Sequence, residues 1–592
     1  MIKLKNEYNG NRSTCRILKI STATSFVMLA IALIILASEQ AQGYEISIYQ
    51  STNILLWVSV FFGICNGFIL LVLSLREETR RLWVLGAFQI VFCNCILISL
   101  YALKGYFQIL FRGDLATYLG MIKDITVFGS ISPDNVYPLP PILFSQLEQV
   151  SSLSPLMLSK ILPSLFFIIY FIGIICWSKE VLNDKKYVAL VTISSIPLFF
   201  AWFSPTIYFQ MLSVWTLPLF FFIIYRCHTH TSFKVLFFIM CFVYPFWHPI
   251  TSIFTCVYLG SVYAYEQLFS RKKPAQNHLL TLTLLFFAIV CLLFWMITQL
   301  ILLKSATRVF EQIIGLLEGY TTADVARYYI TRLGFVDTLR SAYLMFNDDL
   351  IYYLLSIVGI AYVLKNKKME ERFLPIIICL VVGSLLLFLF FFFARIHTVD
   401  RLLNLNFNMV FTPFLVGLVF LTMLNTEKSR KKTILVVVLS GLVLLSTLTA
   451  MVSLYQSPLT IRPNDQTTES EIQGANWLIS NKEFGVNVAK ILSPLSRYSD
   501  FIYGHEYTKS RKDLDLRMIM PDHFGSVGYT LSIQDKDVYI VVTTFDKYSY
   551  SVIWQSTNRF SKSDFTRLNF YSNCYQVYDS INYEVYFNPI DH

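Results

Sequence analysis

Charged residues are scarce in this sequence. Asp, Glu, Lys and Arg together make up 15% of its 592 residues, whereas 55% of the residues are hydrophobic and the mean hydropathy is +0.55. A soluble globular chain does not normally reach these values. The composition therefore excludes an ordinary soluble protein and predicts a polytopic membrane protein.

Cysteine is present without a recognisable framework. Nine of the eleven cysteines fall in or beside apolar runs, and only Cys15 and Cys574 lie elsewhere. Neither a disulfide framework nor a zinc-binding spacing can be drawn from this pattern. The hydrophilic C-terminal segment also lacks a nucleophile elbow, a phosphate-binding loop and a metal-binding motif. We therefore expect that segment to dock or shape a substrate rather than to perform chemistry.

Long apolar runs dominate the first 455 residues. Thirteen of them are candidates for crossing about 30 Å of hydrocarbon, and they lie near residues 17–37, 53–75, 82–103, 160–177, 187–203, 207–226, 233–247, 250–268, 278–303, 349–365, 373–394, 403–425 and 433–455. The first run is too long for a cleaved signal peptide, and a second span follows it at once. The sequence predicts a transmembrane domain over 1–455 with about 13 helices.

The distribution of Lys and Arg predicts the orientation of these helices. The N-terminal tail and the even-numbered connections hold 24 of the 48 basic residues, whereas the short connections near 38–52, 204–206 and 248–249 hold none. Positive charge concentrates on the cytoplasmic side of a membrane. We therefore expect a multi-pass plasma-membrane protein with a cytoplasmic N-terminus and an external segment 456–592. This topology explains the net charge of +10 without a nucleic-acid partner.

Three long segments are expected outside: 104–159, 304–348 and 456–592. The first predicts amphipathic helices over 114–129 and 141–153, separated by the proline-rich turn GSISPDNVYPLPP. The second is also amphipathic, so both loops are expected to lie along the membrane surface. In the third, Thr467 or Thr468 can cap a helix, and the runs KDVYIVVTTF, CYQVYDS and YEVYFN predict strands. The third segment therefore predicts a soluble α/β domain.

Four stretches resemble the GT-C superfamily of integral-membrane glycosyltransferases. They are an external helix that opens at Asp114 and ends in Gly129, the following NVYPLPPI with Tyr137 and Pro138, the turn FWHPIT around His248, and the tail patterns ESEIQGANWL and SKSDFTRLNFYSNCYQVYDSINYEVY. The chain is most similar to prokaryotic members that are distantly similar to oligosaccharyltransferase catalytic subunits and protein mannosyltransferases. The resemblance implies a polyprenyl-phosphate-linked sugar donor, transfer at the outer face, and a catalytic acid in the first external loop.

The chain also departs from this superfamily pattern. Relatives often have a histidine four residues after the acid, where this chain has Tyr118, and no Asp-x-Asp occurs at Asp114. The sequence therefore leaves open whether a divalent cation such as Mg²⁺ or Mn²⁺ takes part. It also leaves open whether the chain is an active enzyme or an inactive scaffold.

Asp114 is the candidate catalytic base. Transfer from a lipid phosphate needs a group that takes the proton of the acceptor hydroxyl as it attacks the anomeric carbon, and a partly desolvated carboxylate can do this. The same residue is suited to the first turn of a helix, where an acid interacts favourably with the helix dipole. The two roles are compatible.

The departing phosphate needs positive charge. The connection ARIHTVDRLLNL supplies Arg395, His397 and Arg401 on the expected outer side, and arginine makes parallel hydrogen bonds to phosphate. The alternative is that these arginines pair with Asp400 or other acids as a structural contact. His248 could bind the acceptor, ligate a metal or help carry a proton, or serve only as a turn residue. Tyr118 and Tyr137 complete the set of candidate substrate-binding residues.

Two other classes of function remain open. A surface-polysaccharide polymerase or ligase would also use lipid-linked donors, but we would expect one dominant external loop, whereas this chain has two moderate loops and a C-terminal domain. A transporter or flippase predicts ionisable residues near mid-span and internal repeats. We expect neither here, because the runs are poor in Asp, Glu, Lys and Arg. The favoured function is transfer of a sugar to a glycan, lipid or protein acceptor.

Overall fold

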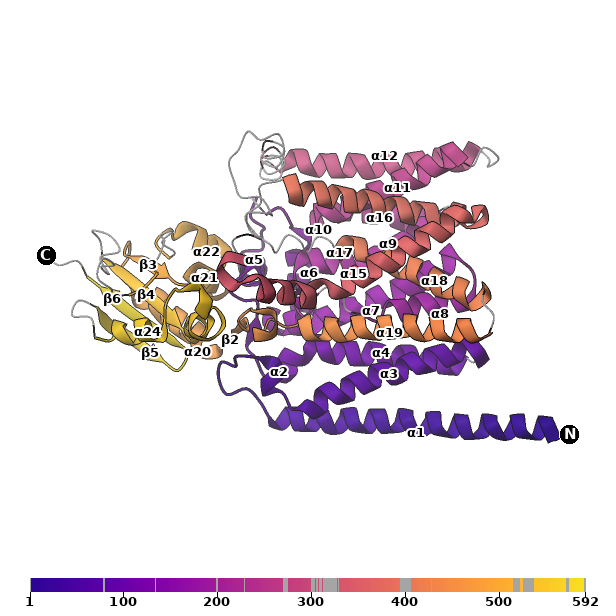
Figure 1. Cartoon of the computed structure of the whole chain (residues 1–592). Coiled ribbons are helices and arrows are strands. Elements are labelled where there is room, and N and C mark those ends of the chain that lie inside the picture. Colours follow the sequence, from indigo (N-terminus) through magenta and orange to yellow (C-terminus); the bar gives the residue numbers. More distant parts are fainter. Residues whose placement is uncertain are drawn as a thin grey trace.

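A bundle of long helices and a smaller domain with a β-sheet make up the molecule (Figure 1). The computed structural model describes residues 2–592 except 78–79, 134, 198–200, 228, 270–274, 300–303, 305–306, 308–310, 312–326, 328–329, 394–405, 427–428, 515–521, 525–536, 571–573 and 590–592. The sheet domain lies at one end of the bundle, and the N-terminus lies at the other end (Figure 1).

Each of the thirteen predicted apolar runs overlaps a helix of the bundle. These helices are α1 (Ile2–Ser38), α3 (Ile54–Glu77), α4 (Arg80–Leu103), α7 (Pro155–Val181), α8 (Lys185–Ser194), α9 (Phe209–Cys227), α10 (Thr231–Trp247), α11 (Pro249–Phe269), α12 (Ala275–Thr298), α15 (Phe335–Lys365), α16 (Lys367–Phe393), α18 (Thr412–Thr426) and α19 (Ser429–Ser453). Within the described part of the chain, nine helical segments are long and apolar enough to cross a membrane. The predicted class, a polytopic helical membrane protein, is confirmed.

Two short helices cover the end of the bundle nearest the sheet domain. They are α5 (Asp114–Phe128) and α6 (Leu139–Ser151), close to the predicted boundaries. Gly129 ends α5 in the left-handed conformation, with φ 67°, and its N–H donates to the carbonyl of Ile125 at 2.8 Å. Glycine adopts this conformation without the steric cost that a Cβ brings. The proline-rich turn that follows then starts α6.

Helix α15 differs from its predicted run. It begins at Phe335, whereas the apolar run begins at residue 349, so the end of the expected surface loop 304–348 belongs to this long helix. Asp348 and Asp349 consequently lie inside the bundle, with exposed fractions of 3% and 6%. Glu266 in α11 is also buried. The expectation that the spans lack acidic residues was therefore wrong, because a short polar sequence does not interrupt a helix whose other faces are apolar.

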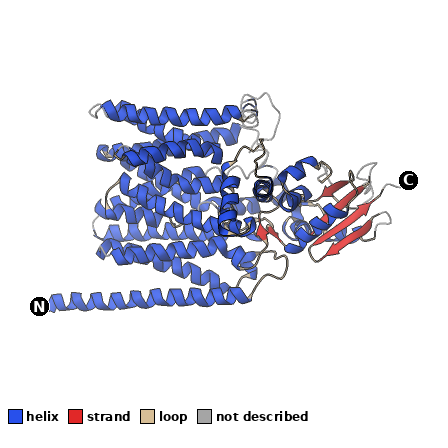
Figure 2. Ribbon diagram, turned by 180° about the vertical axis from the view of Figure 1, so that it is seen from behind, coloured by secondary structure: helices blue, strands red, loops and turns tan. Residues whose placement is uncertain are grey.

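The C-terminal domain is built on a four-stranded sheet of order β3-β4-β6-β5 (Figure 2). The strands are β3 (Asn487–Lys490), β4 (Val538–Thr543), β5 (Tyr575–Ser580) and β6 (Tyr583–Asn588). Strand β3 is parallel to β4, and the other two pairings are antiparallel. All six residues of β4 are buried. The three predicted strands are thus confirmed, whereas the short edge strand β3 was not predicted.

Short helices surround this sheet. They are α20 (Glu469–Asn481), α21 (Leu495–Tyr503), α22 (His505–Ser510), α23 (Thr544–Tyr548) and α24 (Lys562–Leu568). The Thr468 side chain caps α20 by accepting from the N–H of Glu471 at 3.3 Å. Thr468, one of the two threonines predicted to cap this helix, is therefore confirmed as the cap of α20.

The remaining short elements are α2 (Ile48–Ser51), η1 (Ala201–Phe203), α17 (Asn406–Met409), η3 (Pro458–Thr460), η4 (Ser549–Ile553) and η5 (Gln555–Thr557).

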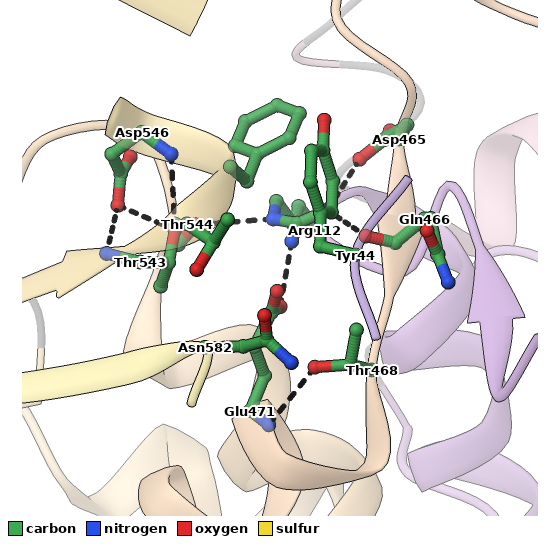
Figure 3. Close-up of polar contacts among 12 residues, drawn as sticks. Tyr44, Arg112, Asp465, Gln466, Thr468, Glu471, Thr543, Thr544, Asp546 and Asn582 are labelled. Atoms are coloured by element: carbon green, nitrogen blue, oxygen red, sulfur yellow. Dashed lines mark hydrogen bonds and ion pairs between the residues drawn. The ribbon is translucent and has the colours of Figure 1, made fainter. Parts of the chain in front are cut away.

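Strand pairing and one arginine connect the first loop to the C-terminal domain. Strand β1 (Gln108–Ile109) pairs with β2 (Gln466–Thr467). The Arg112 side chain, 5% exposed, pairs with Asp465 at 2.9 Å and with Glu471 at 2.6 Å (Figure 3). It also donates to Ser493 Oγ at 3.0 Å and lies 3.9 Å from the centre of the Phe545 ring. We call this cluster the Arg112 clasp.

Candidate functional site

Asp114 lies at the first position of α5, on the side of the bundle that meets the C-terminal domain. The side chain is 54% exposed, and Oδ1 accepts a hydrogen bond from Nη2 of Arg497 in α21 at 2.9 Å. The preceding residue, Gly113, provides no side-chain cap. Asp114 is the acidic residue of the first turn, where a negative charge interacts favourably with the helix dipole. The candidate base is therefore an accessible carboxylate next to a cation.

Helices α5 and α21, which carry this pair, lie in close contact. Nη1 of Arg497 donates to the Thr117 hydroxyl, which donates to Oδ2 of Asp500. His505 Nδ1 contacts the other Asp500 oxygen at 3.0 Å. At Gly120, an added Cβ would overlap the carbonyl oxygen of Asp500. Only glycine allows the two backbones to come this close.

Aromatic rings extend from Asp114 toward the bundle. The Tyr118 ring stacks on Phe209 with centroids 3.8 Å apart, and the Tyr137 ring stacks on His248 at 5.1 Å. Burial, followed by the nearby Asp114 carboxylate, holds the pKa of Tyr118 well above its usual value, and Tyr137 also interacts with it. The structure thus brings Asp114, Tyr118, Tyr137 and His248 into one neighbourhood. We call the rings of Tyr118, Phe209, Tyr137 and His248 the aromatic shelf.

His248 is the turn residue between α10 and α11. The residue is 7% exposed, and Nδ1 has no hydrogen-bond partner among the described residues. Burial lowers the pKa of the imidazole to about 3, so the ring is neutral at physiological pH. A neutral imidazole can accept or donate one hydrogen bond to a bound substrate.

Arg395, His397 and Arg401 lie outside the described residues. The next helix in the chain, α17, begins at Asn406 and places the Phe407 ring 6.2 Å from the His248 ring. The described chain therefore resumes beside the aromatic shelf. The roles of the three residues in phosphate binding remain predictions.

A groove is lined by a different part of α5, and neither Asp114 nor Tyr118, Tyr137 or His248 lines it. It has a volume of about 630 Å³ and lies between α5, the α6–α7 connection and the helices α20 and α21. Leu119, Ile472 and Phe501 supply apolar surface, and Lys123, Gln473 and Asn476 supply polar groups. Mixed apolar and amide surfaces of this kind are typical of ligand-binding clefts.

The described neighbours of Asp114 do not fit a divalent cation. Its ion-pair partner is the guanidinium of Arg497, which is itself positively charged. Where the structure describes the chain, no group of three or more His, Cys, Asp or Glu side chains is placed to hold a metal ion. The residues present thus suit an anionic ligand better than a cation.

Comparison with known proteins gives a distant likeness among solved structures. No family model and no curated protein matches the chain. Among solved structures, it is similar to the oligosaccharyltransferase of Archaeoglobus fulgidus, crystallised as a complex with Zn and sulfate, with a TM-score of 0.43 and 12% sequence identity. The match covers 84% of this chain and 73% of the archaeal chain.

Two features of the structure were not predicted from the sequence. Arg497 lies in an unremarkable stretch, SRYSD, 383 residues from the acid that it contacts, so no local pattern identifies it. Asp348 was placed at the end of the expected loop 304–348, and Asp349 at the start of the expected span 349–365. Each has Oδ1 without a hydrogen-bond partner among the described residues. Two adjacent acids at the start of an apolar run were the signal that could have identified them.

Proposed function

We propose that the chain is a membrane glycosyltransferase. It transfers a sugar from a polyprenyl-phosphate-linked donor to a glycan, lipid or protein acceptor at the outer face of the plasma membrane. The observation that carries this proposal is the accessible carboxylate of Asp114, held beside Arg497 and the aromatic shelf at the junction of the bundle and the C-terminal domain.

In the proposed reaction, Asp114 takes the proton of the acceptor hydroxyl. The acceptor oxygen forms a bond to the anomeric carbon, and the bond from that carbon to the phosphate oxygen breaks. The lipid phosphate leaves with the electron pair, so positive charge stabilises the transition state. Arg395 and Arg401 are proposed contacts for this phosphate, together with His397. Tyr118, Tyr137 and His248 are proposed to orient the sugars.

The proposed orientation follows from charge. The N-terminus and the C-terminal domain lie at opposite ends of the bundle (Figure 1). Because basic residues concentrate in the N-terminal tail and in the connections expected on its side, we propose that this end is cytoplasmic. Asp114, at the end near the C-terminal domain, would then face the outer leaflet and lipid-linked donors.

Sugar transfer from labelled donors tests the proposal. The full chain in membranes is given a panel of polyprenyl-phosphate-linked sugars, and Asp114→Asn is compared with wild type. We expect the variant to lose about 10²- to 10⁴-fold in rate, as for removal of a general base. The matched control is Asp579→Asn, an exposed aspartate of β5, which should transfer at the wild-type rate. Equal rates for wild type and Asp114→Asn would remove Asp114 from the mechanism.

One observation favours a transporter as the second candidate. Asp348 and Asp349 are buried within a membrane-spanning helix, and such acids often line ion or substrate pathways. This alternative predicts that Asp348→Asn together with Asp349→Asn abolishes movement of a lipid-linked sugar across vesicle membranes. If sugar transfer is observed and this double variant leaves lipid movement unchanged, the transporter alternative is excluded.

A further inference from the structure

The C-terminal domain contributes a cation to the candidate active site. Arg497 projects from α21 and contacts two groups of α5, the Asp114 carboxylate and the Thr117 hydroxyl. Its side chain is 34% exposed. A residue of the sheet domain therefore lies where the proposed chemistry would occur.

Stability does not explain this ion pair. Pairs between partly exposed side chains contribute little to stability, because water and salt screen them. Asp114 and Arg497 are 54% and 34% exposed, so they belong to this weak class. The contact between the two helices is secured by other groups, namely Thr117 with Asp500 and the close approach at Gly120. The pair can thus open while α21 stays docked.

The guanidinium of Arg497 retains capacity for another acceptor. Its described hydrogen bonds use Nη1 and Nη2, and a guanidinium has more N–H donors than these two contacts use. Phosphate oxygens match the planar fork of arginine and carry more negative charge than one carboxylate. A phosphate that reaches Arg497 would therefore compete with Asp114 for the same donors.

We propose that Arg497 binds the phosphate of the lipid-linked donor and, by doing so, releases Asp114. Without donor, the carboxylate is held in an ion pair with the guanidinium. When the phosphate engages the guanidinium, the carboxylate becomes free to take the acceptor proton. No covalent bond to Arg497 forms or breaks. This inference rests on the proposed function and deepens it, because it names the phosphate as the group that the C-terminal domain recognises.

Binding of polyprenyl phosphate without a sugar tests the inference independently of catalysis. The full chain is placed in nanodiscs, and the dissociation constant is measured for wild type, Arg497→Gln and Arg497→Lys. We expect Arg497→Gln to weaken binding about tenfold or more, and Arg497→Lys to recover only part of the loss, because lysine keeps the charge but lacks the fork. The matched control is Arg567→Gln, an exposed arginine of α24 in the same domain, which should bind as wild type does.

Asp114→Asn separates phosphate binding from a purely structural pair. Because the carboxylate competes with the phosphate, this variant should bind polyprenyl phosphate more tightly than wild type. A structural role for the pair predicts unchanged or weaker binding. Thermal unfolding of each variant confirms that the fold is intact, and a loss of binding in Arg497→Gln counts only at an unchanged melting temperature. Arg497→Lys, which keeps the charge, decides the question if Arg497→Gln is unstable.

The remaining outcomes distinguish this inference from the proposed function. Unchanged binding by Arg497→Gln overturns the inference even if sugar transfer occurs. Arginine-dependent binding of polyprenyl phosphate without transfer from any donor supports the inference and rejects the enzyme assignment. Inorganic phosphate added as a competitor identifies the source of the anion. If it binds at Arg497 and polyprenyl phosphate does not, the site takes free anions and the lipid assignment is wrong.

Discussion

Two arginines connect the same two parts of this molecule in different ways. Arg112 comes from the first loop, is 5% exposed, and binds two acids of the C-terminal domain. Arg497 comes from the C-terminal domain, is 34% exposed, and binds one acid of the first loop that is itself 54% exposed. A buried charge cannot lose its partners without a large penalty, whereas an exposed one can exchange them for water or a ligand. The comparison separates a fixed contact from an exchangeable one.

The largest expected effect is on the Arg112 clasp. Arg112→Met leaves Glu471, which is fully buried, and Asp465 without their cation. Removing one partner of a buried ion pair costs about 3–5 kcal/mol. We expect a lower melting temperature and faster proteolytic release of the C-terminal domain in nanodiscs. Arg497→Met should change stability by about 1 kcal/mol or less. Equal losses for the two variants would show that burial does not distinguish these arginines.

A smaller effect is expected at Gly120, which allows α21 to approach α5. In Gly120→Ala, the added Cβ would overlap the Asp500 carbonyl, so the helices must separate. Overpacking of this kind costs about 1–3 kcal/mol. Because the shift also displaces Arg497 from the position in which the phosphate is proposed to bind, we expect weaker binding of polyprenyl phosphate at a temperature where the variant is folded. Gly441→Ala, where the added Cβ meets no atom within 4 Å, is the control.

A further effect concerns pH and the Arg112 clasp. Burial raises the pKa of Glu471 from 4.5 to about 7, although Arg112 opposes the shift. A carboxyl whose pKa is higher in the folded state contributes stability that is full below its unfolded pKa and is lost as pH rises. Wild type should therefore lose stability between pH 4.5 and about 7 relative to Glu471→Gln. Melting temperatures of the two proteins across this range measure the difference. If the melting temperature of wild type instead rises relative to that of Glu471→Gln with increasing pH, the attraction of Arg112 outweighs the effect of burial on Glu471.

The sequence predicted most of the helices because their signals are local. Apolar runs, the glycine after α5 and the cap of α20 each depend on a few neighbouring residues. The same reasoning identified β4, β5 and β6, whose alternating aromatic and branched residues are typical of strands. It failed for α15, because polarity at residues 347–349 suggested a loop and the helix buries these residues against its neighbours.

By itself, the sequence determined that the chain is a multi-helix membrane protein with Asp114 at the start of an amphipathic helix. Hydropathy and capping act over a few residues, so they can be read along the chain. Only the tertiary structure decided which cation meets that acid. Arg497 and Asp114 are 383 residues apart, and Arg112 and Glu471 are 359 residues apart. Contacts over such separations have no local period in the sequence, because they form only when α5, α20 and α21 pack together.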